Sequence, residues 1–138
     1  MSLIQNQINR SILLVDDELD IVNLFTELLK GKKYGVFGFT NPLKALEDYK
    51  ENYDQYGMVI SDIRMPKMNG FDLVKNVKKI DPNVSIILMS AYVDIDYSQL
   101  DDITINAFIQ KPIKIMELLS TVEKHLMSTQ NKQIIVDN

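Results

Sequence analysis

Five polar residues of this sequence stand directly after short apolar runs of the kind that form buried strands. They are Asp16 and Asp17 after residues 12–15, Asp62 after 58–61, Ser90 after 86–89, and Lys111, which follows 107–109 through Gln110. If these runs are parallel strands of one sheet, their carboxyl ends share an edge, and open α/β sheets bind ligands at that edge. Three carboxylates, a hydroxyl and an ammonium would then meet in one crevice.

The chemistry predicted for such a crevice centres on a metal ion. Three carboxylates lie close together only when positive charge joins them, and oxygen ligands favour Mg²⁺ over softer metals. Because Mg²⁺ keeps positions open for water and phosphate oxygens, the set predicts a phosphoryl group, with Lys111 balancing its charge and Ser90 donating a hydrogen bond. A carboxylate can itself accept phosphoryl as an aspartyl phosphate. The sequence has no Gly-rich phosphate loop and no dinucleotide motif, so ATP binding is not expected.

Apolar runs alternate with helical repeats along the chain. The expected strands are residues 11–15, 34–39, 58–61, 85–89 and 107–110, with helical segments between them and after the last one. The segment 94–105 is the least regular, because its aspartates make a poor helix interior. Alternation with short connections predicts right-handed crossovers and helices on both faces of a parallel sheet. We therefore expect an α/β fold with a flavodoxin-like, five-stranded parallel sheet in the order 2-1-3-4-5.

Capping and turn residues give the expected limits of several elements. Asp17 is expected to cap the first helix at its start, and Gly31 is expected to cap it at its end. Asn41 before Pro42 is typical of the start of the second helix. The two glycines of the 34–39 strand weaken it, which favours an edge position in the sheet.

Size and composition narrow the function further. The 138 residues suit one domain with a real core, and the net charge of −4 argues against a nucleic-acid surface, which needs basic patches. No apolar run is long enough for a membrane span, so no membrane insertion is expected. The absence of cysteine excludes disulfides and thiolate chemistry and is consistent with a cytoplasmic location.

Four segments, taken together, resemble the receiver domain of two-component response regulators, in particular the single-domain, chemotaxis-type regulators. They are Ile12–Glu18, Asp62–Gly70, Met89–Ala91 and Lys111–Pro112. Each motif alone is modest, but four in order, each at the end of an expected strand, are highly specific. The resemblance covers residues 11–127.

The resemblance implies a role for each acid. Asp62 would be the phosphoacceptor, taking phosphoryl from a phosphohistidine on a sensor histidine kinase or phosphotransfer protein. Asp17, Asp62 and the backbone carbonyl of Arg64 would hold Mg²⁺, with Asp16 reaching the ion through water.

The same resemblance assigns the remaining site residues. Lys111 and Ser90 would contact the phosphoryl oxygens, and the bond between Lys111 and Pro112 is cis in similar proteins. On phosphorylation Ser90 would shift toward the phosphoryl group, and Phe108 would swing inward behind it as a switch. Phe108 replaces the Tyr that the family often has at this position.

Further expectations concern tuning, extent and partners. Arg64 and Tyr92 are bulky where the family tunes access of water to the phosphoryl group, which predicts slow self-dephosphorylation. We expect a lead-in over residues 1–10, the receiver domain over 11–127, and a tail or the start of a linker over 128–138. The chain would act on a downstream protein target or a fused output domain, and a homodimer formed on phosphorylation is a further alternative.

Two other functions compete with this interpretation. One is a Mg²⁺-dependent phosphohydrolase with an aspartyl nucleophile, which usually has a second acid two residues after the nucleophile; here that residue is Arg64. The other is a receiver-like module that binds partners without phosphorylation, against which the intact set of acids, Ser90 and Lys111 argues. The interpretation as a phosphorylated signalling domain, not a metabolic enzyme, is therefore preferred.

Overall fold

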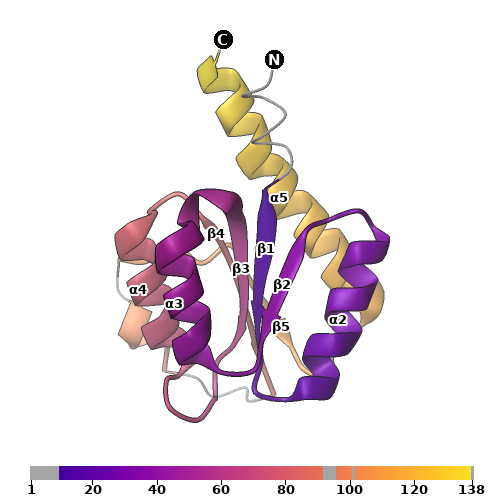
Figure 1. Cartoon of the computed structure of the whole chain (residues 1–138), viewed down its shortest axis with the longest axis vertical. Coiled ribbons are helices and arrows are strands. Elements are labelled where there is room, and N and C mark those ends of the chain that lie inside the picture. The colour runs from indigo at the N-terminus through magenta and orange to yellow at the C-terminus, as the bar shows by residue number, and fades with distance from the viewer. Residues whose placement is uncertain (1–9, 92–95, 101, 138) are drawn as a thin grey trace.

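The protein is built on a parallel sheet of five strands (Figure 1). The computed structural model describes residues 10–91, 96–100 and 102–137. The strands of this part of the chain are β1 (Ser11–Val15), β2 (Val36–Phe39), β3 (Tyr56–Asp62), β4 (Ser85–Ser90) and β5 (Ala107–Gln110). They lie in the order β2-β1-β3-β4-β5, and every neighbouring pair is parallel. The predicted flavodoxin-like order is confirmed, and the glycine-containing β2 lies at an edge as expected.

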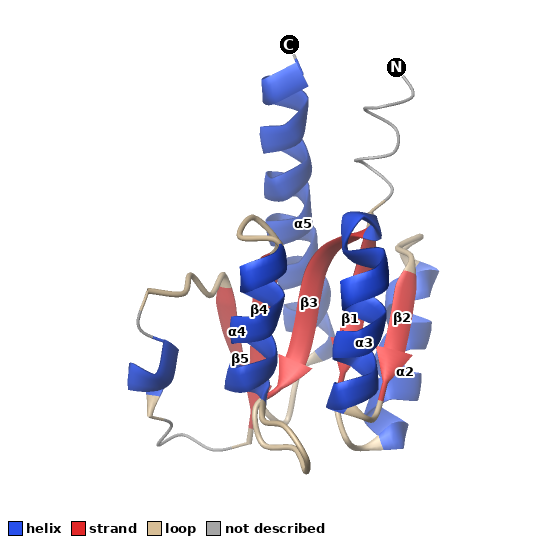
Figure 2. Cartoon of the chain, turned by 60° about the vertical axis from the view of Figure 1, so that its left-hand side comes forward, coloured by secondary structure: helices blue, strands red, loops and turns tan. Residues whose placement is uncertain are grey.

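Helices cover both faces of the sheet. They are α2 (Leu19–Gly31), α3 (Pro42–Asn52), α4 (Gly70–Ile80) and α5 (Ile115–Asp137), with the short 3-10 helices η1 (Tyr53–Gln55) and η2 (Tyr97–Leu100). Figure 2 shows α3 and α4 in front of the sheet and α2 and α5 behind it. Right-handed crossovers between parallel strands produce this division into layers.

The central strands are buried on both faces, as their unbroken apolar sequences predict. In β1, Leu13 and Val15 pack into the core under α3 and α4, whereas Ile12 and Leu14 pack into the core under α2 and α5. All seven residues of β3 and all six of β4 are buried. Each strand therefore has little freedom to move, and the residue that follows it is held at a fixed height on the sheet edge.

Strand register brings the predicted site residues to the same edge. Val15 is paired with Ser61, so Asp16 and Asp62 are the next residues on neighbouring strands. Asp62 is paired with Met89 on β4, and Ser90 is paired with Gln110 on β5. Lys111 follows Gln110 directly, and its backbone N–H donates to the Ser90 carbonyl at 2.7 Å.

Both predicted caps of the first helix are wrong. The N-cap of α2 is Glu18, because the Asp16 carboxylate accepts the Glu18 backbone N–H at 2.9 Å and forms a turn ahead of the helix. The helix includes Gly31, and its C-cap is Lys32. Just after this helix, Lys33 has a positive φ of 73°. By contrast, Asn41 caps α3 as predicted, accepting the Leu43 N–H at 2.9 Å.

The described residues between β4 and β5 do not form an α-helix. Only the single turn of η2 is helical there, and residues 92–95 and 101 lie outside the description. Leu100 is buried, whereas Tyr97 is 47% exposed. Leu100 therefore packs this segment against the core at one point, although the described residues form no continuous helix.

The last helix continues past the predicted limit of the domain. α5 runs to Asp137 and extends beyond the sheet at the end opposite to the predicted crevice (Figure 1). None of the helices in the described residues is long and apolar enough to cross a membrane.

Candidate functional site

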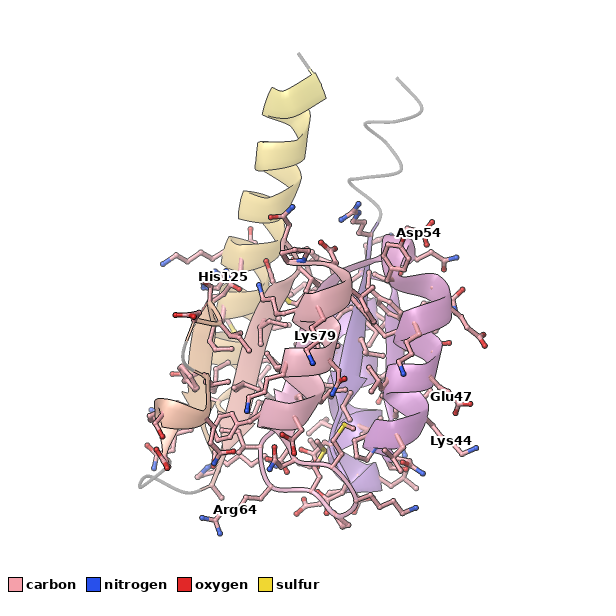
Figure 3. The ribbon with its side chains drawn as sticks, turned by 90° about the vertical axis from the view of Figure 1, so that its left-hand side faces the viewer. Lys44, Glu47, Asp54, Arg64, Lys79 and His125 are labelled. Atoms are coloured by element: carbon pink, nitrogen blue, oxygen red, sulfur yellow. The ribbon has the colours of Figure 1, made fainter. Side chains whose placement is uncertain are left out.

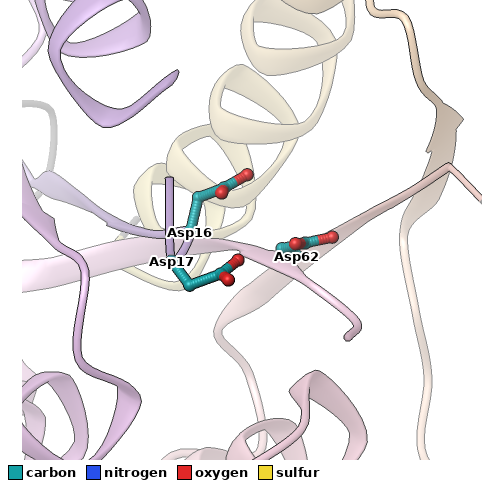
Figure 4. Close-up of side chains that lie close together, drawn as sticks. All are labelled: Asp16, Asp17 and Asp62. Atoms are coloured by element: carbon teal, nitrogen blue, oxygen red, sulfur yellow. The ribbon is translucent and has the colours of Figure 1, made fainter. Parts of the chain in front are cut away.

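Three carboxylates meet where β1 and β3 end (Figure 4). In the described part of the chain, Asp16, Asp17 and Asp62 each offer an oxygen atom, and these atoms lie within 4.8 Å of one another. Asp16 is fully buried and Asp62 is 7% exposed, whereas Asp17 is exposed to solvent. The cluster is thus fixed in the protein on one side and open to solvent on the other.

Lys111 forms ion pairs with two of these acids, Asp16 and Asp62. Its Nζ atom is 2.8 Å from Asp16 Oδ2 and 3.5 Å from Asp62 Oδ2. Burial by itself lowers the pKa of Lys111, but the hydrogen bond to Asp16 and the charge of Asp62 outweigh burial, so the pKa is raised. Lys111 is therefore a fixed cation in this crevice.

The environment of Asp62 disfavours its charged form when no cation other than Lys111 is present. Burial is the main reason that the pKa of Asp62 rises to about 6; Lys111 opposes this change, and the charge of Asp16 adds to it. The Ile63 backbone N–H donates to Asp62 Oδ1 at 3.0 Å and fixes one carboxylate oxygen. Three carboxyl groups and one ammonium make up this cluster, so the acids outnumber the cation.

This donor set fits a hard divalent cation. Clustered carboxylates with an open, solvent-facing side suit Mg²⁺, which retains water and accepts phosphate oxygens as further ligands. A cation here would offset the burial and repulsion that disfavour ionised Asp62.

Ser90 and Phe108 lie around a cavity beside the acids. The cavity has a volume of about 340 Å³. Its lining residues are Ile63, Leu88, Ser90, Tyr97, Phe108, Ile109 and Gln110. Ser90 is buried, whereas Phe108 is 47% exposed and meets the ring of Tyr97 edge-on with centroids 4.8 Å apart.

The predicted tuning residues are Arg64 and Tyr92, and the structure describes the first of them. Arg64 is exposed and points away from the body of the protein at this end (Figure 3). Tyr92 lies outside the described residues. The bond between Lys111 and Pro112 is cis, as the resemblance implied. His125, the one histidine of the sequence, lies on α5 toward the other end of the molecule from Arg64 (Figure 3).

One feature of the site was missed in the sequence, namely the direct pairing of Lys111 with Asp16. The two residues are 95 positions apart, and their contact depends on where two strands of the sheet end. The order of strands indicated that both side chains would reach one crevice. It did not indicate which carboxylate the ammonium would contact first.

The fold and the grouped acids place the protein in one class, the receiver domains of two-component signalling. Residues 12–123 match the family model described as "Response regulator receiver domain". The chain belongs to this family.

Relatives of known name support the same class. Sporulation initiation phosphotransferase F of Bacillus subtilis is 34% identical over 125 residues, covering 89% of this chain and 98% of that protein. Phosphoglycerate transport system transcriptional regulatory protein PgtA of Salmonella typhimurium is 35% identical over 118 residues, covering 84% of this chain but 28% of that protein. The chain therefore spans 98% of the length of one relative and 28% of the length of the other.

The solved structures agree. The response regulator receiver domain protein from Clostridium thermocellum superposes with a TM-score of 0.79 at 25% identity, covering 92% of this chain and 98% of that chain. The predicted receiver class and its phosphorelay role are thus confirmed, whereas the roles of single residues stay predictions.

Proposed function

We propose that Asp62 is the residue of this receiver domain that accepts phosphoryl from a phosphohistidine on a sensor histidine kinase or phosphotransfer protein. The observation that carries the proposal is the grouping of Asp62 with two further acids within 4.8 Å and with Lys111. In the reaction an Asp62 carboxylate oxygen attacks phosphorus and the N–P bond of the phosphohistidine breaks. The imidazole takes a proton from solvent and leaves as a neutral ring. The product is an aspartyl phosphate.

Asp17, Asp62 and the Arg64 carbonyl would hold Mg²⁺, with Asp16 reaching the ion through water. When bound, the ion supplies positive charge for the oxygens of the transferring phosphoryl group. The exposure of Asp17 beside two buried acids supports this proposal, since it leaves one side of the cluster open to water and donor. Asp16 also holds Lys111 in place, because its Oδ2 accepts from the ammonium at 2.8 Å.

Lys111 and Ser90 would receive the charge that arrives with the phosphoryl group. The ammonium is positioned between Asp16 and Asp62 and can bind a phosphoryl oxygen without a large movement. Ser90 ends β4 next to Lys111, to which its carbonyl is hydrogen-bonded at 2.7 Å. Its hydroxyl would donate to a second phosphoryl oxygen.

Phe108 would couple this change to the surface. The half-exposed ring lines the same cavity as Ser90. When Ser90 moves toward the phosphoryl group, the ring can turn inward and fill the cavity, which changes the surface formed by η2 and β5. That surface would bind the downstream target or a fused output domain, or support a homodimer.

The phosphoryl donor would dock on apolar side chains around the mouth of the crevice. Leu19 begins α2 two residues after Asp17, and Met116 lies in the first turn of α5, shortly after Lys111. They are 60% and 76% exposed, and the neighbouring Ile115 is 45% exposed. Exposed apolar residues that form one patch mark sites of protein interaction, and we propose that these three side chains form such a patch beside the acids. Because histidine kinases use ATP of the cell interior, this exchange would take place in the cytoplasm.

The chain would act as a signalling domain, and its turnover would be limited to slow loss of its own phosphoryl group. Arg64, exposed two residues past Asp62, and Tyr92 would restrict access of water. Arg64→Ala should therefore shorten the lifetime of the phosphorylated protein, and an unchanged lifetime would reject this role. A phosphohydrolase would need a general acid where Arg64 stands, which disfavours that alternative.

Intact-mass measurement after incubation with acetyl phosphate and Mg²⁺ tests the proposal. We expect one phosphoryl adduct on the wild-type protein and none on Asp62→Asn or without divalent metal. No adduct under any condition would support a phosphorylation-independent binding module. Rapid release of phosphate without a lasting adduct would instead support the hydrolase.

A further inference from the structure

We propose that Gly70 is a positioning residue for phosphorylation, because only a residue without a side chain lets the start of α4 press against the backbone of Asp62. The inference rests on the proposed function of Asp62 and adds a residue that neither binds metal nor touches phosphoryl. It concerns where the nucleophile is held.

The contact between Gly70 and the end of β3 is unusually close. The Gly70 backbone N–H donates to the Ile63 carbonyl at 2.7 Å. A Cβ atom at position 70 would lie 3.0 Å from Ile63 Cα and 3.2 Å from the Asp62 carbonyl carbon, and still nearer to the Asp62 carbonyl oxygen. All three neighbours are backbone atoms, so no flexible side chain can move aside.

The reason for glycine here is space and not backbone conformation. None of the glycines in the described residues has a positive φ, so position 70 is open to any residue as far as φ is concerned. Alanine at the start of a helix would otherwise be neutral or favourable, since it forms helix more readily than glycine. Gly31 provides the contrast, because a Cβ atom there meets nothing within 4 Å.

Movement of this backbone would reach the reactive carboxylate directly. The Ile63 N–H is shared between the Met89 carbonyl and Asp62 Oδ1, each at 3.0 Å. The Asp62 carbonyl also accepts the Ser61 hydroxyl at 2.8 Å. A side chain at position 70 would displace the Asp62–Ile63 peptide and with it the hydrogen bond that orients the carboxylate.

α4 is fixed firmly enough to act as a support. Phe71, Leu73, Val74 and Val77 are buried against the sheet. Asn69 caps the helix by accepting the Asp72 N–H at 2.9 Å. The helix therefore does not yield easily, and the strain of an added methyl group would fall on the end of β3.

The test compares Gly70→Ala with Gly31→Ala in the acetyl phosphate reaction, measured as adduct formation at saturating Mg²⁺. For Gly70→Ala we expect the limiting rate to fall at least about 10-fold with little change in the donor concentration at half-maximal rate, since small displacements of reacting groups cost rate. Gly31→Ala should match wild type. If wild type forms no adduct, the proposed function fails; if wild type and both variants react equally, only the positioning role fails.

A second pair of variants keeps the test decisive if Gly70→Ala does not fold. Asn69→Ala and Asn41→Ala each remove one side-chain cap, from α4 and from α3. Both should lower the melting temperature to a similar degree, but only Asn69→Ala should slow phosphorylation of the folded protein. Equal rates for the two, whether both normal or both slowed, would overturn the positioning role.

Discussion

The two sides of the crevice are built in opposite ways. The phosphoacceptor core consists of β1, β3, α4 and the acids and Lys111 at the strand ends. Asp62 ends β3 and Asp16 directly follows β1, and the residues of these two strands are almost all buried. The switch edge, formed by η2 and β5, has Ile109 as the one buried residue of its strand, and its Tyr97 and Phe108 are each 47% exposed. Dense packing fixes side chains, whereas sparse packing permits local change. We therefore assign phosphoryl transfer to the core and the conformational change that follows it to the switch edge.

The comparison also separates two kinds of contact. In the core, short polar contacts converge on one carboxylate: Ile63 donates to Asp62, and Lys111 lies between Asp62 and Asp16. At the switch edge the main contact is the edge-on pair of Tyr97 and Phe108, next to a cavity of about 340 Å³. Substitutions in the core should therefore alter the rate of phosphorylation. Substitutions at the switch edge should instead alter the structural change that follows phosphorylation.

The largest effect is expected when the fixed cation of the core is removed. Lys111→Met should slow adduct formation from acetyl phosphate by about 100-fold, the usual loss when one group that stabilises developing charge is deleted. Lys114→Met, an exposed lysine of the same loop, should react like wild type. A Lys111→Met protein that reacts at the wild-type rate would remove the ammonium from the mechanism.

A smaller effect is expected from the solvent-facing acid. Asp17→Asn should weaken Mg²⁺ binding by about 10-fold or more, measured by calorimetry, because a charged oxygen ligand is lost from the cluster. Glu18→Gln, next to it and also exposed, should bind Mg²⁺ nearly as tightly as wild type. Equal losses for both variants would indicate general electrostatic attraction in place of coordination by Asp17.

The raised pKa of Asp62 predicts a pH dependence of stability in the metal-free protein. Since its pKa is about 6 in the folded state and 3.8 is the ordinary value, the folded state binds more protons between these values. Its contribution to the free energy of unfolding should therefore decrease as pH rises from about 4 to 6.

Urea unfolding of wild type and Asp62→Asn at pH 5 and pH 7 measures this contribution. Other groups, including His125, whose pKa is lowered mainly by burial, are common to both proteins and cancel in the difference. Wild type should lose more stability than Asp62→Asn, or gain less, on going from pH 5 to pH 7. A difference of the opposite sign would mean that the Asp62 carboxylate is stabilised in its charged form.

The smallest effect on chemistry is expected at the switch edge. Phe108→Ala should form the adduct within about twofold of the wild-type rate, about 0.4 kcal/mol in the barrier, because the ring belongs to none of the groups proposed to bind metal or phosphoryl. The matched control is Phe37→Ala, which removes a ring 49% exposed on the opposite edge strand, β2. A strong loss of rate in Phe108→Ala alone would show that the switch edge also takes part in phosphoryl transfer.

The same contrast explains which structural features could be predicted from the sequence. Continuous apolar runs such as residues 58–61 indicated central strands, and the residues after them indicated the edge where the acids gather. Burial on both faces leaves such a strand few alternatives. The order of strands, the edge position of β2 and the grouping of Asp16, Asp17 and Asp62 were therefore predicted correctly.

Two kinds of feature were not predicted: which of several neighbouring residues caps a helix, and which residues far apart in the sequence come into contact. Asp17 was expected to cap α2, but Asp16 forms the turn ahead of the helix and Glu18 becomes the N-cap. Gly31 was expected to end the helix, but the left-handed conformation falls on Lys33. The closeness of Gly70 to Asp62 depends on the path of the loop between them, and sequence spacing alone does not give that distance.

Peptide-resolved hydrogen exchange, with and without acetyl phosphate and Mg²⁺, tests most directly whether phosphorylation of Asp62 changes the structure of the switch edge. Exchange should change in peptides covering residues 96–110 and stay nearly constant in those covering β1 and α4. The change should be absent in Asp62→Asn and reduced in Phe108→Ala but not in Phe37→Ala. A change confined to β1 and α4, or one that persists in Asp62→Asn, would contradict the account.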